Sequence, residues 1–187
     1  MKKMILSAVM LVFAASGRAQ EAGAASPTEH NEWLTTFEAV AVDADLDIKF
    51  VKVPDTEAPK IVYDTKGSYT SKFRAEVKDK TLRISERPDS RRPDRTEVTV
   101  YYNTLQSVSL SGAAAVFEGT VDAVQLDLTL GRKASLTAAF DVKDLRMELT
   151  GGSSATLTGK ASYLTLFAST GRVAACLLYT SPSPRDA

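Results

Sequence analysis

The chain has 187 residues, of which 44% are hydrophobic and 25% charged, and its 23 basic residues balance its 23 acidic ones. Nucleic acid is disfavoured as a partner, because binding phosphates needs a concentrated basic face. One histidine and one cysteine exclude a multi-histidine zinc site and an internal disulfide, and we predict no metal site and no cofactor.

Residues 1–19 have the features of a secretory signal peptide. A basic start precedes an apolar stretch over residues 5–15, and the small residue Ala19 precedes the expected cleavage point. The apolar run is too short to span a bilayer. We therefore predict export through the inner membrane to the periplasm, cell surface or extracellular space, with no transmembrane segment in the mature chain.

The segment that follows is predicted to be a spacer and then a series of strands. Residues 20–32 are small and polar without periodicity, which indicates disorder, and order is expected from Trp33. Short alternating runs separated by turn signals predict strands. These cover residues 37–42, 46–53, 61–63, 73–77, 81–85 and 98–102. No long stretch has a helical period, so we predict an all-β chain with a strand-rich N-terminal segment.

A faint repeat of about twenty residues fills the second half of the chain. Its best copies read LQSVSLSGAAAVFEG, LDLTLGRKASLTAA and LRMELTGGSSATLTG. Each copy has an alternating run, a glycine-containing turn and a second run. The predicted turn glycines are Gly112, Gly131, Gly152 and Gly171, the last of which opens a fourth, shorter copy.

Alternation within the copies predicts columns of core residues. The columns are Val108, Leu128, Met147 and Leu166; Leu110, Leu130 and Leu149; Leu126, Leu145 and Leu164; and Phe117, Leu136 and Leu157. A unit of this size buries its apolar face only by stacking on the next unit. We therefore predict a β-solenoid, similar to a right-handed β-helix, with short Ser/Gly-rich coils over the second half of a domain at residues 33–175.

The last residues, 176–187, are predicted not to be native. The peptide CLLYTSPSPRD matches the translation of a common transposase-type sequencing adapter, and we interpret it as read-through from a library fragment. The native domain would then be truncated near Ala175. The only cysteine, Cys176, falls in this tail, and residues 20–175 carry a formal charge of about −3.

Several polar and aromatic residues are candidates for binding. Asp43, Asp45 and Asp47 alternate and are compatible with calcium, but the EF-hand glycine and glutamate are missing, which favours a solvated strand or turn. A charged loop containing Arg87, Arg91, Arg92 and Arg95 is compatible with an acidic glycan or anionic lipid, although interleaved aspartates favour a self-compensated surface loop.

Three further groups each have a functional and a structural interpretation. Arg132 and Lys133 form a basic spot at a turn, or simply keep that turn soluble. The tyrosines either stack on sugars or pack as half-buried strand residues. These are Tyr101, Tyr102 and Tyr163. Phe167 is predicted to point outward, where further coils or a partner would cover it. The only histidine, His30, lies in the predicted spacer, so a Ser-His-Asp triad is not expected.

Four stretches together resemble one bacterial family. They are FEAVAVDADLDIKFVKV, KTLRISE, TEVTVYYNTLQSVSLSGAAAVFEG and LTGGSSATLTGK. They are similar to the GIN-domain family, described as autotransporter adhesin head domains, over nearly all of residues 33–175. The resemblance implies a signal peptide, a strand-rich segment and closing Ser/Gly-rich coils, and it brings no catalytic residues. The turn at Gly131, Arg132 and Lys133 departs from the Ser/Gly pattern.

We therefore predict an exported, non-catalytic module of the cell envelope that is adhesin-like or serves as a scaffold. A glycan or an envelope protein is its expected partner. A carbohydrate-active β-helix enzyme similar to polysaccharide lyases is an alternative, since such enzymes use carboxylates, calcium and an Arg or Lys base. The other alternative is a periplasmic accessory that binds proteins.

Overall fold

The computed structural model describes residues 29–66, 72–87 and 94–179, and in this part of the chain it has twelve strands and no α-helix. The all-β prediction is confirmed. The strands are β1 (Glu29–Trp33), β2 (Ala39–Asp43), β3 (Leu46–Lys52), β4 (Lys60–Asp64), β5 (Phe73–Lys78), β6 (Thr81–Glu86), β7 (Thr96–Tyr102), β8 (Ser107–Ser111), β9 (Ala114–Gly131), β10 (Ser135–Leu149), β11 (Ser154–Ala168) and β12 (Arg172–Tyr179). None of the described segments forms a helix able to span a bilayer.

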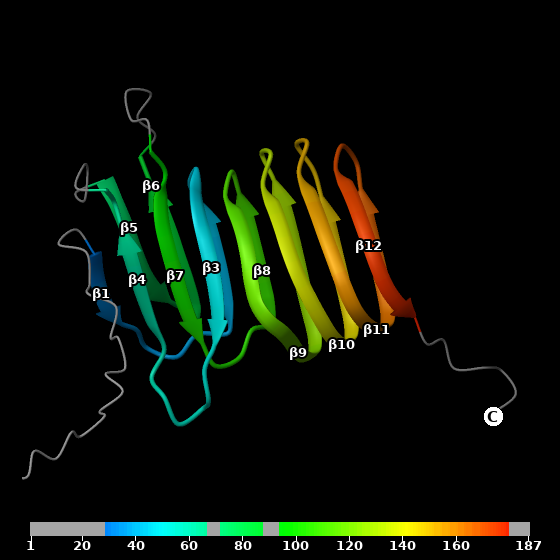
Figure 1. Cartoon of the computed structure of the whole chain (residues 1–187), viewed down its shortest axis with the longest axis horizontal. Coiled ribbons are helices and arrows are strands. Elements are labelled where there is room, and N and C mark those ends of the chain that lie inside the picture. The colour runs from blue at the N-terminus through cyan, green and yellow to red at the C-terminus, as the bar shows by residue number, and fades with distance from the viewer. Residues whose placement is uncertain (1–28, 67–71, 88–93, 180–187) are drawn as a thin grey trace, which may run out of the picture.

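The strands form one open sheet that curls into two layers (Figure 1). Along the sheet the order is β1-β4-β7-β3-β9-β8-β2-β6-β5, and β10, β11 and β12 follow β9 in parallel. The first arm of β9 pairs with β3 and its second arm pairs with β8, so β9 crosses from one layer to the other. The two layers enclose the core, since alternate residues of both are buried.

The first strand corrects the predicted spacer. Residues 20–32 were expected to be disordered, but residues 29–33 form β1, which pairs antiparallel with β4 from Glu29↔Asp64 to Trp33↔Lys60. The His30 ring stacks on Tyr63 with 5.0 Å between ring centroids. All five side chains of β1 are exposed, so the sequence shows no apolar alternation here. The strand is held by backbone pairing and by side-chain contacts that include this ring contact and the hydrogen bond from the Tyr63 hydroxyl to Glu32.

The repeated segment pairs in parallel with a nearly constant offset. In β10 and β11 the offset is 19 residues throughout, from Ser135↔Ser154 to Leu149↔Ala168. Between β9 and β10 the register shifts once, because β9 has extra residues at an irregularity that contains Gly119. The constant offset brings equivalent turns and strands of successive repeats into contact.

The turns between the long strands use left-handed backbone at two successive positions. Gly151 and Gly152 have φ of +60° and +75°, and in the preceding turn Arg132 and Lys133 have φ of +48° and +63°. The Lys133 amide donates a hydrogen bond to the Gly151 carbonyl oxygen at 2.9 Å, so one turn lies directly on the next. The turn after Gly131 therefore has the same backbone conformation as the Ser/Gly turn that follows it, although residues with side chains occupy its two left-handed positions.

The predicted turn glycines therefore have different roles. Gly112, with φ of +86°, and Gly152 occupy left-handed turn positions. Gly131 is the last residue of β9 and Gly171 directly precedes β12, and neither has a left-handed φ.

Replacing Lys133 by glycine is expected to stabilise the protein. A side chain at left-handed φ costs about 1–2 kcal/mol, part of which the extra freedom of glycine in the unfolded chain offsets. Lys133→Gly should raise the free energy of unfolding by about 1 kcal/mol in urea titrations. The matched change, Gly152→Ala, should lower it by a similar amount. Destabilisation by Lys133→Gly would show that the lysine side chain holds the turn.

The structure buries most of the predicted core columns. Eleven of the thirteen residues are at most 5% exposed: Val108, Leu110, Phe117, Leu126, Leu128, Leu130, Leu136, Leu145, Met147, Leu149 and Leu157. Leu164 is only partly buried and Leu166 is 43% exposed, which corrects their assignment to the core. The reason is that β12 covers only the first arm of β11, pairing with Ser154–Ala161, and the second arm has no neighbour beyond it among the described residues.

One predicted column has the wrong register. Phe117, Leu136 and Leu157 were expected to align, but Leu136 pairs with Ala115 and Ala155. Leu157 lies two residues further along and faces a different position of β10. Because every second residue of these strands is apolar, a shift of two residues keeps the alternation, and the pattern alone does not fix the register.

Aromatic rings fill the core where β3, β7, β9 and β10 meet. Phe50 stacks on Phe117 with centroids 4.5 Å apart, and Phe117 lies 6.3 Å from Phe140. Tyr102 packs edge-on against both Phe50 and Phe117. The Tyr102 hydroxyl is buried and makes no hydrogen bond. Burial, together with the nearby Asp122 carboxylate, raises the pKa of Tyr102 to about 12.

Stability should consequently fall at alkaline pH. An unfolded tyrosine ionises near pH 10, whereas folded Tyr102 keeps its proton until about pH 12. The contribution of this group is therefore complete below about pH 10 and is lost as pH rises through about 12. In denaturant titrations at pH 7 and pH 11, Tyr102→Phe should lose less stability than the wild type. It should be no less stable at pH 7, since no hydrogen bond is removed. An equal loss in both proteins would contradict this assignment.

Candidate functional site

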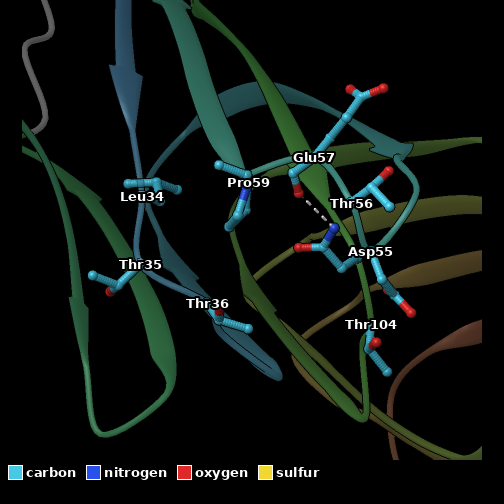
Figure 2. Close-up of a pocket in the computed structure, with 10 residues that line it drawn as sticks. Leu34, Thr35, Thr36, Asp55, Thr56, Glu57, Pro59 and Thr104 are labelled. Carbon is cyan, nitrogen blue, oxygen red and sulfur yellow. Dashed lines mark hydrogen bonds between the residues drawn. The ribbon is translucent and has the colours of Figure 1, made fainter.

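A groove of about 600 Å³ lies among three loops of the N-terminal half (Figure 2). The loops are the segment after β1, the connection between β3 and β4, and the segment after β7. The lining residues are Leu34, Thr35, Thr36, Asp55, Thr56, Glu57, Ala58, Pro59, Asn103 and Thr104. Four of them are threonines, so hydroxyl groups dominate the polar lining.

Asn103 holds the groove together. Its Nδ2 donates hydrogen bonds to the carbonyl oxygens of Pro54 at 2.8 Å and Glu57 at 3.0 Å (the latter is dashed in Figure 2). The Leu34 amide donates to the Pro59 carbonyl oxygen at 2.9 Å, which fixes the segment after β1 against the same connection. Both sides of the groove are thus anchored to the β3–β4 connection by main-chain acceptors.

The chemistry of the groove is that of a polar contact surface. Asp55 and Glu57 are exposed acceptors, and the threonines both donate and accept hydrogen bonds. No lysine, arginine, histidine or cysteine lines it. Such a lining suits an uncharged, hydroxyl-rich or amide-rich ligand. Sequence patterns gave no signal for this site, because its residues come from three separate loops without periodicity.

The three aspartates that were compatible with calcium are instead engaged by arginines. Arg95 forms ion pairs with Asp45 and with Asp47, the latter at 2.9 Å, and Arg132 pairs with Asp43 at 2.8 Å. All of these groups lie near the turn between β2 and β3. Among the described residues, no cluster of three or more His, Cys, Asp or Glu residues has metal-binding geometry.

The structure describes two of the four predicted basic contact residues. Arg91 and Arg92 lie outside the described residues. Arg132 is engaged by Asp43, and Lys133 is exposed in the left-handed turn. The arginine at the end of the charged loop, Arg95, also donates to the Gly112 carbonyl oxygen at 3.2 Å, which ties it to a turn.

The aromatic candidates are also dispersed. Tyr102 is buried in the core, whereas Tyr101 lies under the Lys60 ammonium group, which is 4.5 Å from its ring centroid. Tyr163 is half exposed, and Phe167, as the alternation predicts, points outward and is 61% exposed. The tyrosines therefore do not form one sugar-binding surface.

The comparisons with known proteins identify the family. The family model described as "Putative auto-transporter adhesin, head GIN domain" matches residues 36–181. The chain belongs to the GIN-domain family. This match extends past Ala175 into the segment predicted to be adapter-encoded, and the origin of that segment stays a prediction. No curated protein matches the GIN-domain chain.

A solved structure shares the fold of this GIN domain, and a second is similar at a lower score. A crystal structure of "a putative adhesin from Parabacteroides merdae" is 14% identical, with 78% of this chain and 71% of that chain covered and a TM-score of 0.52. A "putative adhesin" from Bacteroides fragilis is 13% identical, with coverages of 79% and 95% and a TM-score of 0.49. At such identities the likeness to the first structure shows a shared fold alone.

Proposed function

We propose that this chain is an exported, non-catalytic module of the cell envelope that acts as an adhesin-like or scaffolding domain. The observation that carries the proposal is the match of the adhesin-head family model to residues 36–181. The threonine-lined groove held by Asn103 supports it, because its lining provides hydrogen-bonding groups for a polar partner and no nucleophile paired with a base.

The repeated half is proposed to be a β-solenoid similar to a right-handed β-helix. Its support is the constant 19-residue offset between β10 and β11 and the direct stacking of the Lys133 turn on the Gly151 turn. A stack of this kind provides long, flat outer faces for contact with a partner.

Export by the signal peptide at residues 1–19 is part of the same proposal. When the full chain is expressed in a bacterial host, we expect it in the periplasmic fraction with Gln20 as its N-terminus. N-terminal sequencing of the purified protein checks this. Retention in the cytoplasm with Met1 or Lys2 at the N-terminus would refute export.

Binding and catalysis can be separated in one set of assays. Beads coated with the purified protein are expected to retain envelope fragments or whole cells better than albumin-coated beads. Incubation with a polysaccharide panel is expected to release neither unsaturated nor reducing sugar. Sugar release would favour the lyase-like alternative, and retention that protease treatment of the fragments abolishes would favour a protein partner.

A further inference from the structure

A continuous row of outward-facing residues crosses six strands of the layer that contains β2. Strand registers place its members opposite one another from β6 to β11: Thr81, Ala39, Ser107, Asp127, Arg146 and Thr165. Neighbouring strands lie about 4.8 Å apart, so the row is about 24 Å long across the strands. It provides a path across the strand direction.

The surface is low toward the middle of this path because the side chains there are small. Ala39 and Ser107 are followed, two residues along their strands, by Ala41 and Ser109. Larger residues stand toward the β11 end, where Glu148 pairs in register with Phe167. Two hollows, of about 290 and 180 Å³, lie along the path, and Asp127 lines both of them. We call this surface the cross-strand trough.

Asp127 has an unused hydrogen-bonding atom in the trough. Its Oδ1 is buried and has no hydrogen-bond partner among the described residues, and its Oδ2 accepts a long hydrogen bond of 3.4 Å from Gln125 Nε2 at an exposed position. Because Oδ1 is closed to solvent, a ligand would reach this carboxylate through Oδ2, where the hydrogen bond from Gln125 is long; Asp127 therefore favours a ligand rich in hydroxyl groups.

The other lining groups narrow the class of ligand. The smaller hollow is lined by the exposed Phe167 ring together with Arg146 and Glu148. The larger one includes two side-chain amides, of Gln106 and Gln125. Acidic residues outnumber basic ones over the two hollows, which disfavours a polyanion. An aromatic face beside planar polar groups is suited to a sugar ring, and the strand spacing is close to the length of one sugar in an extended chain.

We propose that the cross-strand trough binds a neutral linear polysaccharide that lies across the strands. Asp127 accepts hydrogen bonds from its hydroxyl groups, and Phe167 packs against the face of one sugar ring. The proposal rests on the adhesin-like function above and names a ligand class and a surface distinct from the threonine-lined groove.

Affinity electrophoresis in native gels tests the trough. The probes are a β-1,3-glucan, a mixed-linkage β-glucan and a galactomannan, with polygalacturonate as the anionic comparison. At least one neutral polymer is expected to retard the purified protein, and polygalacturonate is not. Asp127→Asn and Phe167→Ala should each weaken the apparent affinity about tenfold, since about 1.4 kcal/mol is lost with one charged hydrogen bond or one ring contact.

Two control variants remove the same kinds of group from surfaces outside the trough. Glu118→Gln removes an exposed carboxylate on the opposite layer, and Trp33→Ala removes an exposed aromatic ring on β1. Both are expected to bind as the wild type, and thermal melting checks that all four variants fold. Unchanged binding in both trough variants, equal losses in the controls, or retardation by polygalacturonate alone would overturn the proposal. Absence of retardation by all neutral polymers would also overturn it, while bead retention of envelope fragments would still support the adhesin-like function.

Discussion

Gly159→Ala is expected to be among the most destabilising single substitutions in this chain. Gly159 has φ of +117°, and an added Cβ would overlap the Phe140 carbonyl oxygen and lie 2.9 Å from the Phe140 nitrogen and carbonyl carbon. Those atoms belong to the paired backbone of β10, so they cannot move as the end of a side chain can. Backbone strain and overpacking together should lower the free energy of unfolding by about 3–5 kcal/mol.

Gly119→Ala is the matched control for this effect. Gly119 also has a left-handed φ, +80°, but an added Cβ would meet nothing within 4 Å. Its cost should therefore be the backbone term alone, about 1 kcal/mol. Urea titrations of both variants measure the difference. Equal destabilisation would contradict the close approach of Gly159 to Phe140.

The second large effect separates two leucines of one column. Leu128 and Leu166 both flank Met147 in register, but Leu128 is 2% exposed and Leu166 is 43% exposed. Leu128→Ala should cost about 2–5 kcal/mol, because it leaves a cavity inside the core. Leu166→Ala should cost less than about 1 kcal/mol, because half of its surface is already in water. The comparison uses denaturant titrations at one pH.

Similar losses for Leu128→Ala and Leu166→Ala would mean that the second arm of β11 is covered in solution. The melting temperature would then depend on protein concentration if a second copy of the chain supplies the cover.

Strand alternation predicted the all-β class and the positions of the strands closely. The run at residues 46–53 became β3 (Leu46–Lys52), and the run at 98–102 became the second half of β7 (Thr96–Tyr102). Alternation works here because one face of each strand is buried and the other is solvated. It failed for β1 (Glu29–Trp33), whose exposed side chains carry no such pattern.

Register and turn geometry were less predictable. The turn at Arg132 and Lys133 departed from the glycine pattern, although its backbone has the same left-handed conformation as the turn at Gly151. Composition signals a left-handed position only when glycine or asparagine occupies it. Likewise, the irregularity in β9 at Gly119 shifts the residue offset between β9 and β10 without disturbing the apolar alternation.

The candidate sites depended on contacts between distant segments. The sequence showed Asp43, Asp45 and Asp47 as an alternating acidic set, but it did not show that Arg95 and Arg132 reach them. Nor did it indicate that Asp127 has a buried oxygen without a partner. Both facts depend on which strands become neighbours, and that is a property of the fold and not of local pattern.

The most direct test of a non-catalytic, polysaccharide-binding module measures binding and polymer cleavage on the same sample. The purified protein is mixed with neutral polysaccharide, bound protein is quantified by affinity electrophoresis, and the polymer is then analysed by size-exclusion chromatography. We expect retardation with an unchanged polymer size distribution. Shortening of the polymer would contradict a non-catalytic module and identify an enzyme instead.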